Sequence, residues 1–257
     1  MATTIDSAAR PARDRLFLWL AITCAVVAIG GFMPTYWMQL PARTFRGPPL
    51  LHIHGAFATL WIVYLISQAW LVSAGRIRNH RAWGLLGISL ASIVFVLGVV
   101  TAIAALRTEL AAGYGDAALS FLIVPLSAIG GFAGFTAAAI ANVRRPEWHK
   151  RLMIAGTVNL IGAAAARIGF VIATGGGPGA RPGLFPPPPA LPVIVTGLLI
   201  QLILIAGMIH DRRTRGRIHP AWTIGLVVNV AIVLLRQPIG ATPDWLAFAD
   251  WTTRIAG

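Results

Sequence analysis

Long apolar segments alternate with short polar or Gly/Pro-rich connections along this 257-residue chain. A helix that crosses a bilayer needs about 20 mainly apolar residues, because its backbone polar groups must pair within the helix where water is absent. Seven segments meet this requirement, and we place them near Leu16–Thr35, Leu50–Ala74, Trp83–Leu106, Ala117–Asn142, Leu152–Thr174, Leu191–Ile209 and Ala221–Gln237. The pattern predicts an all-α, polytopic transmembrane bundle of seven spans over residues 16–238.

The composition excludes an ordinary soluble domain. The chain is 57% hydrophobic and only 11% charged, whereas soluble domains average about 25% charged residues. The net charge of +13 raises the question of a nucleic-acid partner. We expect none, because no module that combines basic and aromatic residues lies outside the predicted spans.

The basic residues fall mostly on one side of the predicted bundle. Fourteen of them share that side: Arg10, Arg13, Arg15, Arg76, Arg78, Arg81, Arg144, Arg145, Lys150, Arg151, Arg212, Arg213, Arg215 and Arg217. The other side has Arg43, Arg46, Arg181 and Arg254, with Arg107 near a helix end. The positive-inside rule then predicts a cytoplasmic N-terminus and an external C-terminus. The basic rim is also expected to contact anionic lipid headgroups.

The two ends of the chain lie outside the predicted spans. Residues 1–15 are expected to form a cytoplasmic arm. Residues 239–257 contain Trp245, Phe248 and Trp251 but are too short and polar to cross the bilayer. Aromatic side chains favour the membrane–water boundary, so this tail is predicted to be an outer interfacial helix.

Three cytoplasmic connections share a pattern that indicates an internal repeat. Each has a histidine at the start of the next helix, at His80, His149 and His219, with spacings of 69 and 70 residues. A glycine follows each one, at Gly87, Gly156 and Gly225. A bundle built from repeated helical hairpins explains the period. A regular hairpin bundle with basic inner loops explains it equally.

Ionisable residues within the spans are the strongest candidates for function. Each costs roughly 2.5–3.5 kcal/mol to place in the membrane, so it should face the bundle interior. Arg167 and Arg236 are predicted to reach the outer leaflet, near His52 and His54 at the start of the second span. Snorkelling of the side chain towards water explains the presence of Arg107 in a span well, but it explains the presence of Arg167 least.

Further polar residues line the predicted interior. His54, Trp61 and Gln68 recur at intervals of seven residues and therefore share one face of a helix. Three amides, Asn159, Gln201 and Asn229, lie near the middle of their spans. We expect the amides to form hydrogen bonds between helices rather than a functional site.

The connection from Gly175 to Pro189 joins a glycine-rich piece to a run of prolines. Glycine makes the first part flexible, and polyproline makes the second part stiff. The segment is either a simple connector or a lid over an outward-facing site.

The histidines suggest haem ligation. A low-spin haem needs two axial ligands from facing helices, and its propionates favour nearby arginine. His54 is a first ligand on the outer side, where Met33 is a candidate for the sixth position. On the inner side His80, His149 and His219 offer a bis-histidine pair, although interfacial histidines beside basic loops would look the same. His52 and His54 cannot chelate one metal from a regular helix, but they could from an extended segment after Pro48 and Pro49.

Three motifs carry a resemblance: His54-Gly55, His80-Arg81 with Gly84 and Gly87, and His149-Lys150-Arg151-Leu152-Met153. They resemble motifs of poorly characterised bacterial multi-pass membrane families, and this resemblance implies a location in the bacterial cytoplasmic (inner) membrane. More distantly, they are similar to the transmembrane di-haem cytochromes b of the ascorbate-reducible type. That resemblance implies histidine-ligated haem b at helix ends. The chain departs from the di-haem pattern because the outer side has no paired histidines.

These observations lead to three functional hypotheses. The first is a membrane redox protein that binds haem b or a quinone, with His54, His80 and His149 as metal ligands and Arg167 and Arg236 holding propionate or quinone oxygens. The second is a carrier or receptor for a small anion bound by the two arginines. The third is a structural or assembly subunit of a larger membrane complex, in which the buried polar groups only join helices.

Overall fold

The computed structural model describes residues 15–255, which form helices and connecting loops without a β-strand. Seven helical segments are long and apolar enough to cross a membrane: Leu16–Trp37, Pro49–Ser73, Ile77–Ala111, Gly115–Ala141, Pro146–Thr174, Ala190–Arg215 and Pro220–Gly240. The seven predicted spans are thus confirmed. The third is longer than predicted at both ends, because its helix continues into the polar residues that flank the apolar run.

Four of the seven spans contain two helical elements. In order along the chain, the elements are α1 (Leu16–Phe32), η1 (Met33–Trp37), α2 (Pro49–Ser73), α3 (Ile77–Ala111), α4 (Gly115–Phe121), α5 (Ile123–Ala141), α6 (Pro146–Leu160), α7 (Gly162–Thr174), α8 (Ala190–Leu199), α9 (Leu202–Arg215), α10 (Pro220–Gly240) and α11 (Pro243–Ile255). The η1 element is one turn of wider π-helix that contains Pro34. Such turns form where proline removes a backbone donor.

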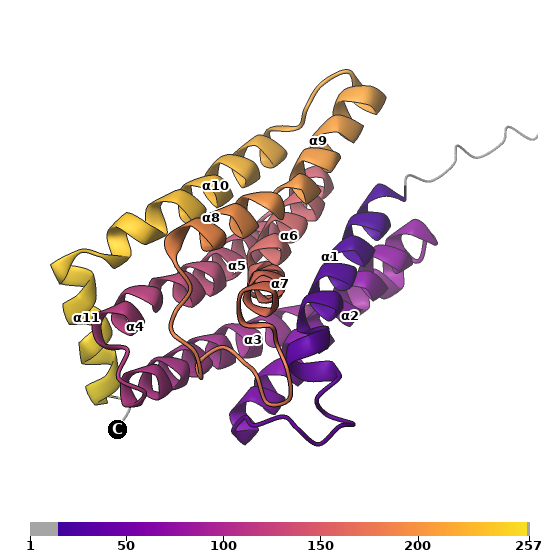
Figure 1. Cartoon of the computed structure of the whole chain (residues 1–257). Coiled ribbons are helices and arrows are strands. Elements are labelled where there is room, and N and C mark those ends of the chain that lie inside the picture. The colour runs from indigo at the N-terminus through magenta and orange to yellow at the C-terminus, as the bar shows by residue number, and fades with distance from the viewer. Residues whose placement is uncertain (1–14, 256–257) are drawn as a thin grey trace, which may run out of the picture.

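The α5–α6 hairpin forms the centre of the bundle (Figure 1). Helix α3 packs against α5, α10 packs against both α5 and α6, and α1 packs against α2 and α7. In Figure 1, α8, α9 and α10 lie on one side of this centre, and α1 and α2 lie on the other. Trp61, Phe132, Val158, Leu204 and Trp222 are completely buried where these helices meet.

The outward faces of the helices are strongly apolar. Leu85, Ile172 and Leu191 are 73%, 80% and 70% exposed, respectively. Large contiguous apolar surfaces are rare on proteins that are surrounded by water. The surface is therefore consistent with contact with the hydrocarbon of a lipid bilayer.

The helix connections divide the bundle into two ends. We call the end with the α2–α3, α5–α6 and α9–α10 connections the basic end, because it contains Arg76, Arg78, Arg81, Arg144, Arg145, Lys150, Arg151, Arg212, Arg213, Arg215 and Arg217. The opposite end is called the far end. Arg10, Arg13 and nearly all of the predicted arm 1–15 lie outside the described residues. The assignment of the basic end to the cytoplasm stays a prediction.

The C-terminal tail forms the expected helix, α11, which runs across the far end (Figure 1). It packs against α3 and α4. The Trp245 indole donates a hydrogen bond to the Leu119 carbonyl at 3.1 Å. Arg107 donates to the Thr253 carbonyl at 2.5 Å, so this arginine ties α3 to α11.

Glycine allows two helix contacts that shape the interior. A Cβ atom at Gly31 would overlap the Ala164 carbonyl, so its absence lets α1 approach α7. A Cβ atom at Gly87 would overlap the Tyr64 ring, which therefore packs directly on the backbone of α3. Both contacts lie beside predicted site residues, Arg167 on α7 and His80 on α3.

Candidate functional site

His80 and His149 come together at the basic end of the bundle. Each occupies the first turn of its helix, on α3 and α6 respectively. Their ring centres are 6.3 Å apart and the ring planes are inclined by 74°. Sequence separation gives no hint of this contact; it arises because α3 and α6 both pack against α5.

The hydrogen bonding of the two rings leaves coordinating nitrogens free. The Nδ1–H of His149 donates to the Ala139 carbonyl on α5 at 2.9 Å, which fixes the ring and leaves Nε2 as the nitrogen for a ligand. The Nδ1 of His80 is buried and has no hydrogen-bond partner. Buried polar atoms are normally paired, so an unpaired one calls for an explanation.

The third histidine of the repeat, His219, has a different role. Its Nδ1 accepts a hydrogen bond from the Ala221 amide at 3.2 Å and so caps the start of α10. Its ring packs edge-on against Trp148, with centres 5.3 Å apart. Burial, followed by the positive charge of Arg151, lowers the pKa of His219. The structure therefore supports a pair of histidines at this end, and His219 stands apart as a helix cap.

A buried ion pair beside these histidines was not expected from the sequence. The Arg151 and Asp211 side chains are only 1% and 2% exposed, and they join α6 to α9 with Nη2–Oδ1 and Nε–Oδ2 distances of 2.5 and 3.0 Å. Glu147 accepts from Arg151 at 2.7 Å and also pairs with Arg215. From the sequence, Arg151 was counted only among the basic residues that determine the orientation of the bundle in the membrane. One feature of the sequence could have indicated the ion pair: Asp211 is an acidic residue at the end of an apolar segment, directly before Arg212 and Arg213.

Towards the far end, Arg167 and His54 form a second polar group. The Arg167 guanidinium lies over the Phe32 ring at 4.3 Å, and its Nη1 donates a long hydrogen bond of 3.4 Å to the Thr35 hydroxyl. Its charge also acts electrostatically on His54 on α2. His54 Nδ1 and Arg167 Nε are both buried and unpaired. No hydrogen bond joins His54 to Arg167 among the described residues, so their predicted association stays a prediction.

His52 cannot join His54 in a chelate. Helix α2 begins at Pro49, so both histidines lie on a regular helix and point in different directions. The extended segment considered from the sequence is therefore wrong, because Pro49 occupies the first turn, where proline is well tolerated. His52 instead shares a 2.9 Å hydrogen bond with the Tyr36 hydroxyl. Met33, on η1, is 40% exposed.

Arg236 belongs to a different helix contact from Arg167. Its Nη2 donates to the Val193 carbonyl on α8 at 2.8 Å, which holds α10 against α8. Arg167 instead contacts α1 and η1, and no interaction joins the two guanidinium groups among the described residues. The structure thus does not bring the two arginines of the anion hypothesis together.

The polar residues along the middle of the spans mainly connect helices. Asn159 donates to the Asn229 side chain at 2.6 Å, and Asn229 donates to the Ala155 carbonyl at 3.2 Å. On the predicted stripe of α2, the buried Trp61 donates to the Thr157 hydroxyl at 3.3 Å. Gln201 donates to Gly197 within its own span.

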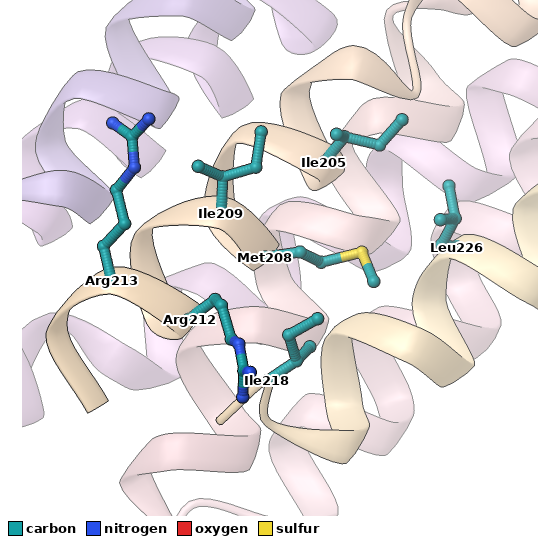
Figure 2. Close-up of a pocket in the computed structure, with 7 residues that line it drawn as sticks. All are labelled: Ile205, Met208, Ile209, Arg212, Arg213, Ile218 and Leu226. Carbon is teal, nitrogen blue, oxygen red and sulfur yellow. The ribbon is translucent and has the colours of Figure 1, made fainter. Parts of the chain in front are cut away.

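An apolar depression of about 360 Å³ lies between α9 and α10 (Figure 2). Its lining consists of Ile205, Met208, Ile209, Arg212, Arg213, Ile218 and Leu226. Figure 2 shows the two arginine side chains diverging at its edge. None of the predicted site residues lines it, so this depression is separate from the histidine pair.

Within residues 15–255, no group of three or more His, Cys, Asp or Glu side chains is arranged to hold a metal ion. No protein family, curated protein or solved structure matches this chain. The proposal below consequently rests on the geometry of the chain itself.

Proposed function

We propose that this chain is a membrane electron-transfer protein that binds haem b between His80 and His149. The observation that carries the proposal is the 6.3 Å separation of the two ring centres. An imidazole nitrogen binds a transition metal at about 2 Å. Two imidazoles on opposite faces of one haem iron therefore have ring centres about 6 Å apart.

The chemistry of the two side chains also fits this group. Metal-bound histidines commonly donate their second ring N–H to a carbonyl, as His149 does to Ala139. The unpaired Nδ1 of His80 supports the proposal, because it is a buried ring nitrogen without a hydrogen-bond partner among the described residues. Arg81 follows His80 and acts on it electrostatically, so positive charge is available for the haem propionates.

Bound haem would supply a one-electron carrier, and the chain would hold and tune it. His80 and His149 are presented from two helices that both pack on α5, which fixes the distance between the ligands. The apolar helix surfaces would exclude water and favour the less charged ferrous state. With the basic end at the cytoplasm, the carrier would lie near the inner face of the bacterial membrane, where a quinone or a partner subunit could exchange electrons.

The test is the absorption spectrum of the purified full chain, expressed with haem supply and reduced with dithionite. We expect a Soret band and an α band in the wild type, and the loss of most bound haem in His80→Ala and in His149→Ala. His52→Ala is the matched control, because His52 lies at the far end and bonds only Tyr36. A wild type without these bands, or unchanged haem content in both ligand variants, would reject the proposal.

A further inference from the structure

Arg167 is a cation within a membrane-spanning helix for which the structure provides no counter-ion. The carboxylates that form ion pairs among the described residues are Glu147, Asp211 and Asp250, and none of them contacts Arg167. Its Nε is buried and unpaired. A buried charge without a partner is very costly, so such groups are normally paired or bind a charged ligand.

The Phe32 ring and the Thr35 hydroxyl contact Arg167, and neither carries a negative charge. Thr35 is 2% exposed and accepts from Arg167 through its hydroxyl oxygen, so its own proton is left to donate. The unpaired Nδ1 of His54 can donate in the appropriate tautomer. Arg181 adds a second positive charge that acts on Arg167. An arrangement of this kind repels cations and favours an anionic oxygen.

The α7–α8 loop is tied to η1, the turn that contains Thr35. The buried Gln39 side chain donates to Pro34 and to Ala180, at 3.1 and 3.0 Å, and thereby ties the α7–α8 loop to η1. Next to this tie is a depression of about 280 Å³, lined by Pro34, Met38, Gln39, Ala42, Thr44, Gly177 and Pro178. Pro34 lines this depression and precedes Thr35 in the chain, whereas Arg167, Thr35 and His54 do not line it.

We propose that Arg167, Thr35 and His54 form a binding site for an anionic oxygen group, a carboxylate or a phosphate. The guanidinium fork matches two oxygens of such a group, and the low dielectric around it strengthens the interaction. This site lies towards the other end of the bundle from the histidine pair and does not depend on haem.

The source of the anion is either a small soluble molecule or a lipid headgroup. The test uses the full chain in nanodiscs made of phosphatidylcholine alone. Binding of inorganic phosphate and of succinate is measured by titration calorimetry at millimolar concentrations. In a second arm, phosphatidylglycerol is added to the nanodiscs and retained lipid is counted by native mass spectrometry. Both arms compare the wild type with Arg167→Gln and Arg167→Lys.

We expect Arg167→Gln to weaken binding about tenfold to a hundredfold, because it removes a charge-assisted hydrogen bond. Arg167→Lys keeps the charge but loses the fork, so it should bind with intermediate affinity and also fold normally. Arg254→Gln, an exposed arginine at the same end, is the control and should bind as the wild type does.

Each outcome bears on the proposal. Arg167-dependent binding of phosphate or succinate supports a soluble ligand, and Arg167-dependent binding of phosphatidylglycerol alone supports a lipid. The absence of Arg167-dependent binding in both arms overturns the proposal. Haem content is read from the same samples, so an anion site without haem would reject only the electron-transfer proposal.

Discussion

Arg151 and Asp211 are 60 residues apart in the chain and form a buried ion pair between α6 and α9. The Arg151 guanidinium also lies near the rings of Phe17 and Trp222, at 5.5 and 5.7 Å. Helices α1, α6, α9 and α10 therefore meet at one arginine. Because both charges are almost fully buried, Asp211 depends on Arg151 for compensation, and Arg151 depends on Asp211 together with the partly exposed Glu147.

Replacing Asp211 by asparagine should destabilise the bundle strongly. The change removes the buried carboxylate and leaves Arg151 with only the partly exposed Glu147 as counter-ion. Loss of one partner of a buried pair typically costs about 3–5 kcal/mol, and Glu147 should hold the loss to the lower part of that range. The measurement is the free energy of unfolding in mixed micelles. Asp250→Asn is the control, because Asp250 pairs with the exposed Arg254 and should change stability by less than about 1 kcal/mol.

The double variant Arg151→Met/Asp211→Leu separates the contribution of the ion pair to stability from the contribution of side-chain packing. Apolar side chains of similar size often replace a buried ion pair with little cost. We expect the double variant to be more stable than Asp211→Asn. Equal loss of stability in Asp211→Asn and Asp250→Asn would show that the pair does not hold α6 to α9.

Neighbouring glycines on α1 provide a test of the α1–α7 contact. Gly31→Ala places a Cβ atom against the Ala164 backbone, whereas a Cβ atom at Gly30 meets nothing within 4 Å. Overpacking of this kind typically costs about 1–3 kcal/mol. Gly30→Ala should be neutral or stabilising, because alanine favours helix by about 1 kcal/mol over glycine. Thermal unfolding of both variants measures the difference, and equal melting temperatures would contradict the close contact.

His219 should make stability depend on pH. Burial lowers its pKa in the folded protein, and its Nδ1 must be unprotonated to accept from the Ala221 amide. The unfolded chain takes up this proton near pH 6.5, while the folded protein takes it up only at lower pH. The stabilisation is therefore complete above about pH 6.5 and decreases as the pH falls below it.

His219→Asn isolates this effect. Asparagine also caps a helix start but does not titrate, so the variant should lose the part of the acid sensitivity that belongs to His219. Unfolding of the two proteins should be followed between neutral and acidic pH. Identical pH profiles would show that the His219 cap does not control this dependence.

The seven spans could be predicted from the sequence because they depend on a local property. Each segment is apolar over the length of a bilayer crossing, and no tertiary information is needed to detect it. The division of four spans into two helical elements was not predicted. The apolar content of a segment does not indicate where the helix within it changes its winding. The start of α2 at Pro49 was open for a similar reason, because Pro48 and Pro49 suit either an extended segment or a first helical turn.

The sequence identified the histidines and arginines that were candidates for the site, but it did not identify their partners, because these depend on how the helices pack. His80 and His149 resembled His219 in sequence, and only the packing of α3 and α6 on α5 separates the pair from the cap. Arg236 resembled Arg167 as an arginine within a span; its Nη2 donates to the Val193 carbonyl, while its Nε, like that of Arg167, is buried and unpaired. Asn159 and Asn229 were expected to join helices, and their hydrogen bond does so.

The most direct test of the central proposal is the spectrum of His80→Gly with and without added imidazole. Removing one axial ligand should convert six-coordinate, low-spin haem into a five-coordinate form, and free imidazole should fill the cavity and restore the low-spin spectrum. Restoration would place His80 at the metal rather than in the supporting structure. A low-spin spectrum that is the same in the wild type and in His80→Gly, with no response to imidazole, would contradict ligation by His80 and His149.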